Sequence, residues 1–212
     1  MVREVFRHFG RYLVEFLTMH RTADLEASLE GDAHLREAYR RYRCAIVLTG
    51  HLGNWEVGAA LLQRMGFPVS VVALPHDDAA TDRFFNAQRR RCGVEVIPLG
   101  ASAAQQSLRR LRQGQVLGVL GDRVFAGDGL SCAVDGLRMT LPLGPATLSV
   151  RAQAPIIPAF VVRQRPGAFR FLFEPPLQPM TGVEPMIQAY AAVLAKYLRR
   201  FPEQWLMFQP LQ

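Results

Sequence analysis

The 212-residue sequence contains no run of about 18 apolar residues, which is the length that a helix needs to cross a lipid bilayer. Its first residues also lack the apolar stretch that marks a signal peptide. We therefore expect neither a transmembrane helix nor a secretory leader in this sequence.

Cysteine is scarce, and the three cysteines, Cys44, Cys92 and Cys132, show no Cys-x-x-Cys spacing. An odd and scattered set argues against a disulfide scaffold and against a zinc site. We expect a reduced protein that faces the cytosol, and we predict no metal centre.

Lysine is almost absent, since Lys196 is the only one, and arginine carries the net charge of +7. Arginine binds phosphate and carboxylate groups in bidentate geometry, which predicts an anionic partner such as nucleic acid, lipid phosphate or an acidic carrier. GC-rich coding explains the arginine-to-lysine ratio equally well, but it does not explain the net charge. Because no aromatic interleaving or RNA-binding signature is present, nucleic acid is not the expected partner.

Half of the residues are hydrophobic, which suits one domain with a full core. Near-continuous apolar segments alternate with helical patterns, and this predicts an α/β fold whose sheet is covered on both faces. We predict a single domain with a helical region at 1–43 and a catalytic core at 44–212. The glycine-rich segment 121–142 is the longest expected loop and is a candidate lid or binding loop. The expected strands are 44–49, 69–74, 94–98, 115–120, 156–162 and 169–174, and the expected helices are 2–19, 55–65, 79–92, 101–113, 144–153 and 183–200.

Residues 2–19 have apolar side chains at helical spacing, with Arg3, Arg7 and Arg11 turned away from that stripe. A basic amphipathic helix at a terminus either packs on its domain or lies on an anionic membrane surface. The spacing alone leaves both alternatives open.

The stretch GHLGNWE, residues 50–56, follows the first expected strand of the core. His51 can serve as a general base near neutral pH, and a carboxylate such as Glu56 can fix its tautomer. On a regular helix these two side chains would point about 140° apart, so they can meet only across non-helical backbone. Gly53 permits such a turn, and Asn54 suits the N-cap of the next helix. The alternative is that His51 caps a turn while Glu56 lies in solvent.

A second cluster, GVLGDRV, places Asp122 and Arg123 just after the expected strand 115–120. In α/β sheets, functional groups gather beyond the carboxyl ends of the strands, so this cluster and His51 should share one rim. Arg123 could bind a phosphate, and Asp122 could hold Arg123 or the preceding loop. The alternative is a surface Asp–Arg pair, which would contribute little.

Taken in order, these blocks resemble a known family. The stretch GHLGNWE resembles the His-x4-acid block of the lysophospholipid acyltransferase superfamily, and its Asn-Trp-Glu ending resembles in particular the late lauroyl and myristoyl acyltransferases of bacterial lipid A biosynthesis. The blocks LRQGQVLGVLGDR, LPLGPATLSVRAQAPIIPAFVVR and FPEQWLMFQP resemble later parts of the same family, and VFRHFGRYLVEFL resembles its opening helix.

The resemblance implies a glycerol-phosphate-acyltransferase-like fold with a mixed, mostly parallel sheet. It also implies that His51 is the catalytic base and Glu56 its carboxylate partner, and that Asp122 and Arg123 serve the acceptor or phosphate region. We add Asn54 and Gly121, from the same blocks, to the predicted substrate-binding residues. The expected reaction moves a fatty acyl group from acyl carrier protein or coenzyme A to a hydroxyl of a lipid A precursor or related glycolipid. It needs no metal, cofactor or acyl-enzyme.

The resemblance places the expected activity at the cytoplasmic face of a bacterial inner membrane. Family members usually carry a membrane-anchoring segment ahead of the opening helix, where this sequence begins. We therefore expect membrane contact through the basic amphipathic helix. Where family members are rich in aromatic residues after the Asp- and Arg-bearing loop, this chain reads LSCAVDGLRM, so a phosphatidylinositol mannoside or a lysolipid is also a candidate acceptor.

Two rival functions remain open. One is an esterase or thioesterase that uses His51 to activate water, although the sequence has no Gly-x-Ser-x-Gly elbow. The other is a non-catalytic module that binds anionic lipid or nucleic acid through its basic surface. Substitution of His51 discriminates these functions, because a binding module has no activity to lose.

Overall fold

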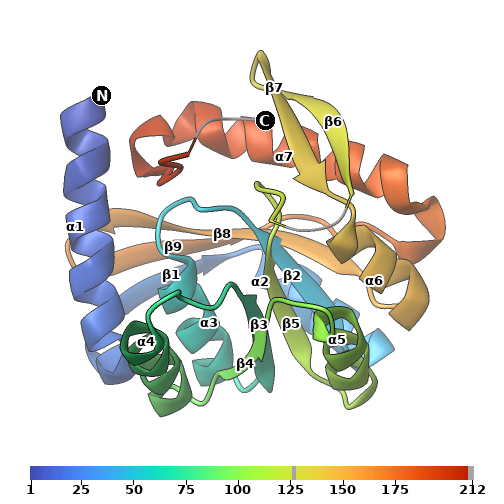
Figure 1. Cartoon of the computed structure of the whole chain (residues 1–212), viewed down its shortest axis with the longest axis horizontal. Coiled ribbons are helices and arrows are strands. Elements are labelled where there is room, and N and C mark those ends of the chain that lie inside the picture. The colour runs from blue at the N-terminus through green and yellow to red at the C-terminus, as the bar shows by residue number, and fades with distance from the viewer. Residues whose placement is uncertain (126–127, 210–212) are drawn as a thin grey trace.

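The computed structural model describes residues 1–125 and 128–209 and shows an α/β domain with a seven-stranded sheet (Figure 1). The strand order is β1-β9-β8-β2-β5-β3-β4. The strands β2, β3, β4, β5 and β8 are mutually parallel, whereas β9 pairs with β8 antiparallel and with β1 parallel. This mixed, mostly parallel sheet confirms the predicted fold class. The strand bounds are β1 Glu26–Glu30, β2 Ala45–Thr49, β3 Val69–Ala73, β4 Glu95–Pro98, β5 Val116–Leu120, β8 Ile156–Arg165 and β9 Ala168–Phe173.

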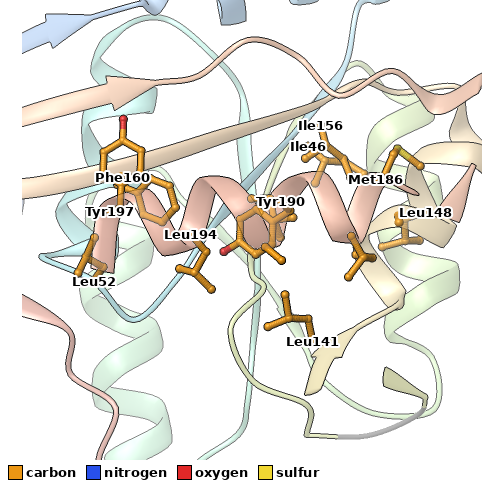
Figure 2. Packing of buried hydrophobic residues seen from close by; sticks show 14 of the residues in the cluster. Ile46, Leu52, Leu141, Leu148, Ile156, Phe160, Met186, Tyr190, Leu194 and Tyr197 are labelled. Carbon is orange, nitrogen blue, oxygen red and sulfur yellow. The ribbon is translucent and has the colours of Figure 1, made fainter. Parts of the chain in front are cut away.

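Helices cover both faces of the sheet, and each face has its own apolar core. The core on one face includes side chains from α1 to α4, and the core on the other includes side chains from α5 to α7. In Figure 2, Met186, Tyr190 and Tyr197 of α7 pack against Ile156 and Phe160 of β8. The helices are α1 Val2–Thr18, α2 Asp32–Tyr42, α3 Trp55–Arg64, α4 Ala79–Arg91, α5 Ala103–Arg112, α6 Gly144–Ala152 and α7 Val183–Arg200, with short 3-10 turns η1 Met19–Asp24, η2 Pro179–Thr181 and η3 Pro202–Gln204.

The predicted helical region 1–43 also contains a strand, which the sequence analysis missed. The edge strand β1 has mostly exposed side chains in the sequence EASLE, so it lacks the apolar run of a buried strand. The helix α2 lies within the predicted helical region, but the sequence analysis gave it no bounds of its own, because only Leu35 and Ala38 among its residues are buried. A weak apolar stripe of this kind gives little helical periodicity.

The predicted loop 121–142 is wrong over its second half, because β6 (Gly129–Val134) and β7 (Leu137–Pro142) form an antiparallel hairpin there. Asp135 and Gly136 both have positive φ, at 49° and 78°, in the two-residue connection. Asp-Gly between two strands favours this turn, so the hairpin signal was present in the sequence. The hairpin rises above the sheet beside α7 (Figure 1).

Candidate active site

His51 and Asp122 meet at the carboxyl edge of the sheet because β2 and β5 are parallel neighbours. Thr49, the last residue of β2, is in register with Leu120, the last residue of β5. Two residues beyond each strand, the His51 Nδ1 atom lies 2.8 Å from Oδ1 of Asp122. The backbone N–H of His51 also donates to Oδ2 of Asp122 at 2.7 Å. The same side chain therefore fixes both the imidazole and the backbone that carries it.

The Asp122 side chain is completely buried, and this burial acts to raise its pKa. The nearby imidazole of His51 and the hydrogen bonds from His51 and Trp205 outweigh burial, so the pKa of Asp122 lies below its ordinary value. A carboxylate facing Nδ1 accepts a hydrogen bond from Nδ1–H of the imidazole. In this tautomer Nε2 of His51 carries no hydrogen and can act as a base.

Glu56 does not occupy the position that the sequence analysis gave it. Its carboxylate accepts hydrogen bonds from Arg89 of α4, including one from Nε at 3.0 Å, and both side chains are buried. Glu56 is the second residue of α3, and Arg89 reaches it from the neighbouring helix. The hydrogen-bonded partner of the His51 imidazole is Asp122, whereas the Glu56–Arg89 ion pair ties α3 to α4.

Asn54 is fully buried, so its position gives no support to the predicted contact with substrate. Its side-chain oxygen caps α3 by accepting from the Val57 N–H at 3.2 Å, as its N-cap position predicts. Its amide donates to Glu15 of α1, which is itself paired with Arg163 of β8 in a buried ion pair. Asn54 therefore holds the start of α3 in place.

The turn before Asn54 requires glycine. Gly53 has a φ of 70°, and a Cβ atom there would lie 1.8 Å from the carbonyl oxygen of Val161. The backbone N–H of Asn54 donates to that same oxygen. The turn that carries His51 is therefore packed directly against β8, and no side chain fits at position 53.

The two remaining predicted substrate-binding residues differ in their surroundings. Gly121 is buried against Leu48 and Tyr190, where a Cβ atom would lie 2.6 Å from the nearest Leu48 atom, so it serves packing. Arg123 lines the cavity beside His51, and its guanidinium carbon lies 4.2 Å from the ring centre of Phe125. No carboxylate in the described residues pairs with Arg123. It is the predicted substrate-binding residue that reaches the cavity.

A cavity of about 760 Å³ opens beside His51 and reaches both faces of the sheet. This volume lies in the range of ligand-binding pockets. Its apolar wall beside α3 consists of Val47, Ala59, Leu62, Val69, Val71, Val161 and Phe171, whose side chains belong to the core on that face or pack against it. The other part lies beside α5 and α6, with Ala103, Ala104, Ser107, Thr147, Leu148 and Arg151.

The C-terminal segment also belongs to the site, a role that the sequence analysis missed although it noted the Pro-Glu-Gln-Trp block. Trp205 follows η3, and its indole Nε1–H donates to Oδ2 of Asp122 at 3.1 Å. The backbone of this segment pairs with the turn around His51, through Leu206 N–H to the His51 carbonyl and Gly53 N–H to the Gln204 carbonyl. The closing Trp, 154 positions after His51 in the chain, is thus next to the candidate base.

No helix in the described ranges is long and apolar enough to cross a membrane. Among the same residues, no three His, Cys, Asp or Glu side chains are grouped so that they could hold a metal ion.

A buried carboxylate that orients a histidine at the wall of a large, mainly apolar cavity defines a site suited to activating a hydroxyl or water against an apolar substrate. The chain belongs to the bacterial lipid A biosynthesis acyltransferase family, whose family model matches residues 1–211. This confirms the family resemblance, and it places the chain among acyltransferases.

The chain is also similar to phosphatidylinositol mannoside acyltransferases. It is 28% identical over 213 residues to those of two Mycobacterium tuberculosis strains, CDC 1551 / Oshkosh and ATCC 25618 / H37Rv, which covers 95% of this chain and 67% of the relatives. It is 28% identical over 182 residues to that of Mycolicibacterium smegmatis, covering 84% of this chain and 59% of the relative. The chain therefore spans about two thirds of the length of these relatives or less.

Proposed function

We propose that this acyltransferase moves a fatty acyl group from an acyl thioester, carried by acyl carrier protein or coenzyme A, to a hydroxyl group of a glycolipid. The observation that carries the proposal is the position of His51. Its Nδ1 atom is hydrogen-bonded to the buried Asp122, and the residue lines the large cavity. A base held in this way faces the space where an apolar acyl chain would lie.

In the proposed mechanism, the acceptor hydroxyl attacks the thioester carbonyl while Nε2 of His51 takes the hydroxyl proton. Asp122 stabilises the imidazolium that forms, because its carboxylate is fixed against Nδ1 and does not need to reorganise. The tetrahedral intermediate then breaks its C–S bond, and the imidazolium returns the proton to the leaving thiolate. The ester bond replaces the thioester bond without a covalent acyl-enzyme.

The developing oxyanion needs a hydrogen-bond donor, and the candidates are backbone N–H groups near His51 and the side chain of Arg123. The backbone N–H groups of His51, Gly53 and Asn54 already donate to Asp122, Gln204 and Val161 respectively. We assign the role to the guanidinium of Arg123, which lines the same cavity and lies three residues after the last residue of β5, directly after Asp122.

The acceptor is proposed as a glycolipid because the mycobacterial relatives are named for acylation of a phosphatidylinositol mannoside and the family for lipid A biosynthesis. Such acceptors place the reaction at a membrane surface, and we propose the cytoplasmic face of a bacterial inner membrane. Exposed Val2 and Phe6 on α1, with the Phe208 ring tilted against that of Phe6 at 5.6 Å between ring centres, provide an apolar surface flanked by arginines for that contact.

Lipid mass spectrometry tests the proposal. Cells that express the wild-type chain or His51→Ala, at equal levels of folded protein, are compared for lipids that gain one acyl chain. We expect the gain with wild type alone, and the mass difference then identifies both acceptor and chain length. Identical lipid profiles, also after an N-terminal membrane anchor is added, would refute acyl transfer to a lipid.

A further inference from the structure

The C-terminal segment contacts the candidate catalytic pair, His51 and Asp122, and the turn after His51 through one side-chain and two backbone hydrogen bonds. Trp205 donates its indole N–H to Oδ2 of Asp122 at 3.1 Å. Leu206 N–H donates to the His51 carbonyl at 2.7 Å, and the Gln204 carbonyl accepts from Gly53 N–H at 2.9 Å. Leu52 and Trp205 form an isolated antiparallel bridge between these two strips of backbone. The segment thus contacts the histidine-bearing turn and the carboxylate at once.

This segment is itself held rigidly by β8. The Gln204 side chain, which is buried, accepts from the Arg163 backbone N–H at 2.8 Å and donates to the Arg163 carbonyl at 2.9 Å. Both polar ends of the amide are therefore satisfied by one residue of a central strand. A buried side chain with both groups paired in this way has little freedom to move, so it fixes the position of the indole that follows.

Trp205 does not line the cavity, so contact with substrate does not account for its hydrogen bond. Asp122 Oδ2 accepts from two donors, the His51 backbone N–H and the Trp205 indole. Its other oxygen, Oδ1, faces the imidazole. The indole therefore shares the negative charge of Asp122 with the imidazole, and it fixes the plane of the carboxylate.

We propose that Trp205 is a positioning residue of the acyl transfer reaction, which orients the Asp122 carboxylate toward the His51 imidazole and limits how strongly that carboxylate binds it. The expected change in reaction rate rests on the proposed function. The effect of Trp205 on the hydrogen bond between His51 and Asp122 can be measured without turnover. The groups that face Asp122 are His51, the Trp205 indole and Tyr190 of α7, whose hydroxyl donates to the Thr49 carbonyl. Arg123 follows it in the chain.

The variant that tests this is Trp205→Phe, which keeps an aromatic ring in the half-buried position and removes the N–H. With one donor fewer, the Asp122 carboxylate binds the Nδ1–H of His51 more strongly. Hydrogen bonds to charged groups are strong enough for their loss to move a titration by about one pH unit. We expect the acid limb of the kcat/KM profile to move to higher pH by about that amount. We expect kcat to fall about tenfold, because the Asp122 carboxylate loses the donor that fixes its plane. We expect KM to stay unchanged, because the cavity wall is intact.

Trp55→Phe is the matched control, because it removes an indole N–H beside the same imidazole, 4.9 Å away between ring centres. Among the described residues, no hydrogen bond joins that indole to Asp122. The acid limb of this variant is expected at the wild-type pH, whatever happens to its rate. An equal shift in both variants, or none in Trp205→Phe, overturns the proposal.

Proton NMR of the folded proteins separates this inference from the proposed function. The Nδ1–H resonance of His51 reports its hydrogen bond to Asp122 and does not require a substrate. We expect it to move downfield in Trp205→Phe and to stay in place in Trp55→Phe. An unmoved resonance in Trp205→Phe refutes the positioning role even in an active enzyme. Absence of transferase activity in wild type, with the resonance moved as expected, refutes the proposed function alone.

Discussion

Glu56 lies five residues after His51, yet its carboxylate is paired with Arg89, 33 positions further along the chain. The imidazole is paired instead with Asp122, 71 positions away. The His-x4-acid block therefore contains one residue of the candidate catalytic pair and one residue of a buried ion pair between two helices. This division assigns different consequences to the loss of the two carboxylates.

Substitution of Asp122 by Asn should reduce turnover with little change in folding. An amide can donate to Nδ1 of His51 and so stabilise the tautomer that carries its hydrogen on Nε2, where the base is needed. We expect kcat to fall by about 10³-fold or more. Steady-state kinetics with circular dichroism checks this expectation. A variant with near-wild-type turnover would remove Asp122 from the proposed mechanism.

Substitution of Glu56 by Gln should act mainly on stability. It leaves the buried Arg89 guanidinium without its carboxylate, and removal of one partner from a buried ion pair costs about 3–5 kcal/mol. Urea unfolding measures this loss. At a temperature where the variant is folded, we expect a smaller fall in kcat than for Asp122→Asn.

The double variant Glu56→Gln/Arg89→Met provides the matched control. If the ion pair is structural, removal of both charges should recover much of the stability that Glu56→Gln loses. A double variant that is as stable as expected from additive losses would show that the two side chains are not coupled. A Glu56→Gln protein with full stability and no activity would return Glu56 to a catalytic role.

The sequence predicted the sheet well because its central strands are buried on both faces and read as apolar runs. The bounds of β2, β3 and β5 agree with the predicted strands to within one residue. The edge strand β1 escaped because three of its five residues are charged or serine and it is solvated. An edge strand is exposed to solvent, so it can form without the apolar run that a strand buried on both faces requires.

Placement of His51 at the carboxyl edge followed from strand order, and so did the expectation that Asp122 shares that edge. Which carboxylate faces the imidazole could not be read from spacing, because it depends on the register of β2 against β5 and on the competing partner Arg89. The contribution of Trp205 was equally hidden. It depends on a segment that returns to the first turn of the core after 150 residues of intervening chain, and no local pattern encodes such a contact.

The lowered pKa of His8 leads us to expect a pH dependence of stability that is separate from catalysis. Burial and the adjacent Arg163 lower the pKa of His8 below the ordinary value of 6.5. Its Nδ1 atom lies 2.6 Å from Nη1 of Arg163, which donates to the neutral ring. Below about pH 6.5 the unfolded chain takes up a proton at His8 that the folded protein resists, so unfolding is favoured.

The contribution of neutral His8 to stability is therefore fully present above pH 6.5 and declines as the pH falls below it. Urea unfolding of wild type and His8→Gln between pH 7.5 and 5.5 measures this, because Gln keeps an acceptor for Arg163 without titrating. We expect the loss of stability on acidification to be smaller in His8→Gln. Parallel curves for the two proteins would contradict the assignment to His8.

If the apolar wall beside α3 receives the acyl chain, as proposed, we expect Ala59 and Leu62 to control the length of that chain. Both residues lie on α3 and line the cavity. Ala59→Leu adds volume to that wall and should shift the products toward shorter acyl chains. Leu62→Ala removes volume and should shift them toward longer chains, at a cost of about 2–5 kcal/mol in stability.

Competition between acyl thioesters of different length, with products identified by mass spectrometry, measures both shifts in one mixture. The two variants are matched controls for each other, because a general loss of fit would change the total rate without moving the preference in opposite directions. Shorter chains with Ala59→Leu and longer chains with Leu62→Ala would place the acyl chain on the α3 side of the sheet. An unchanged preference in both variants would place it in the part of the cavity beside α5 and α6, where neither side chain reaches.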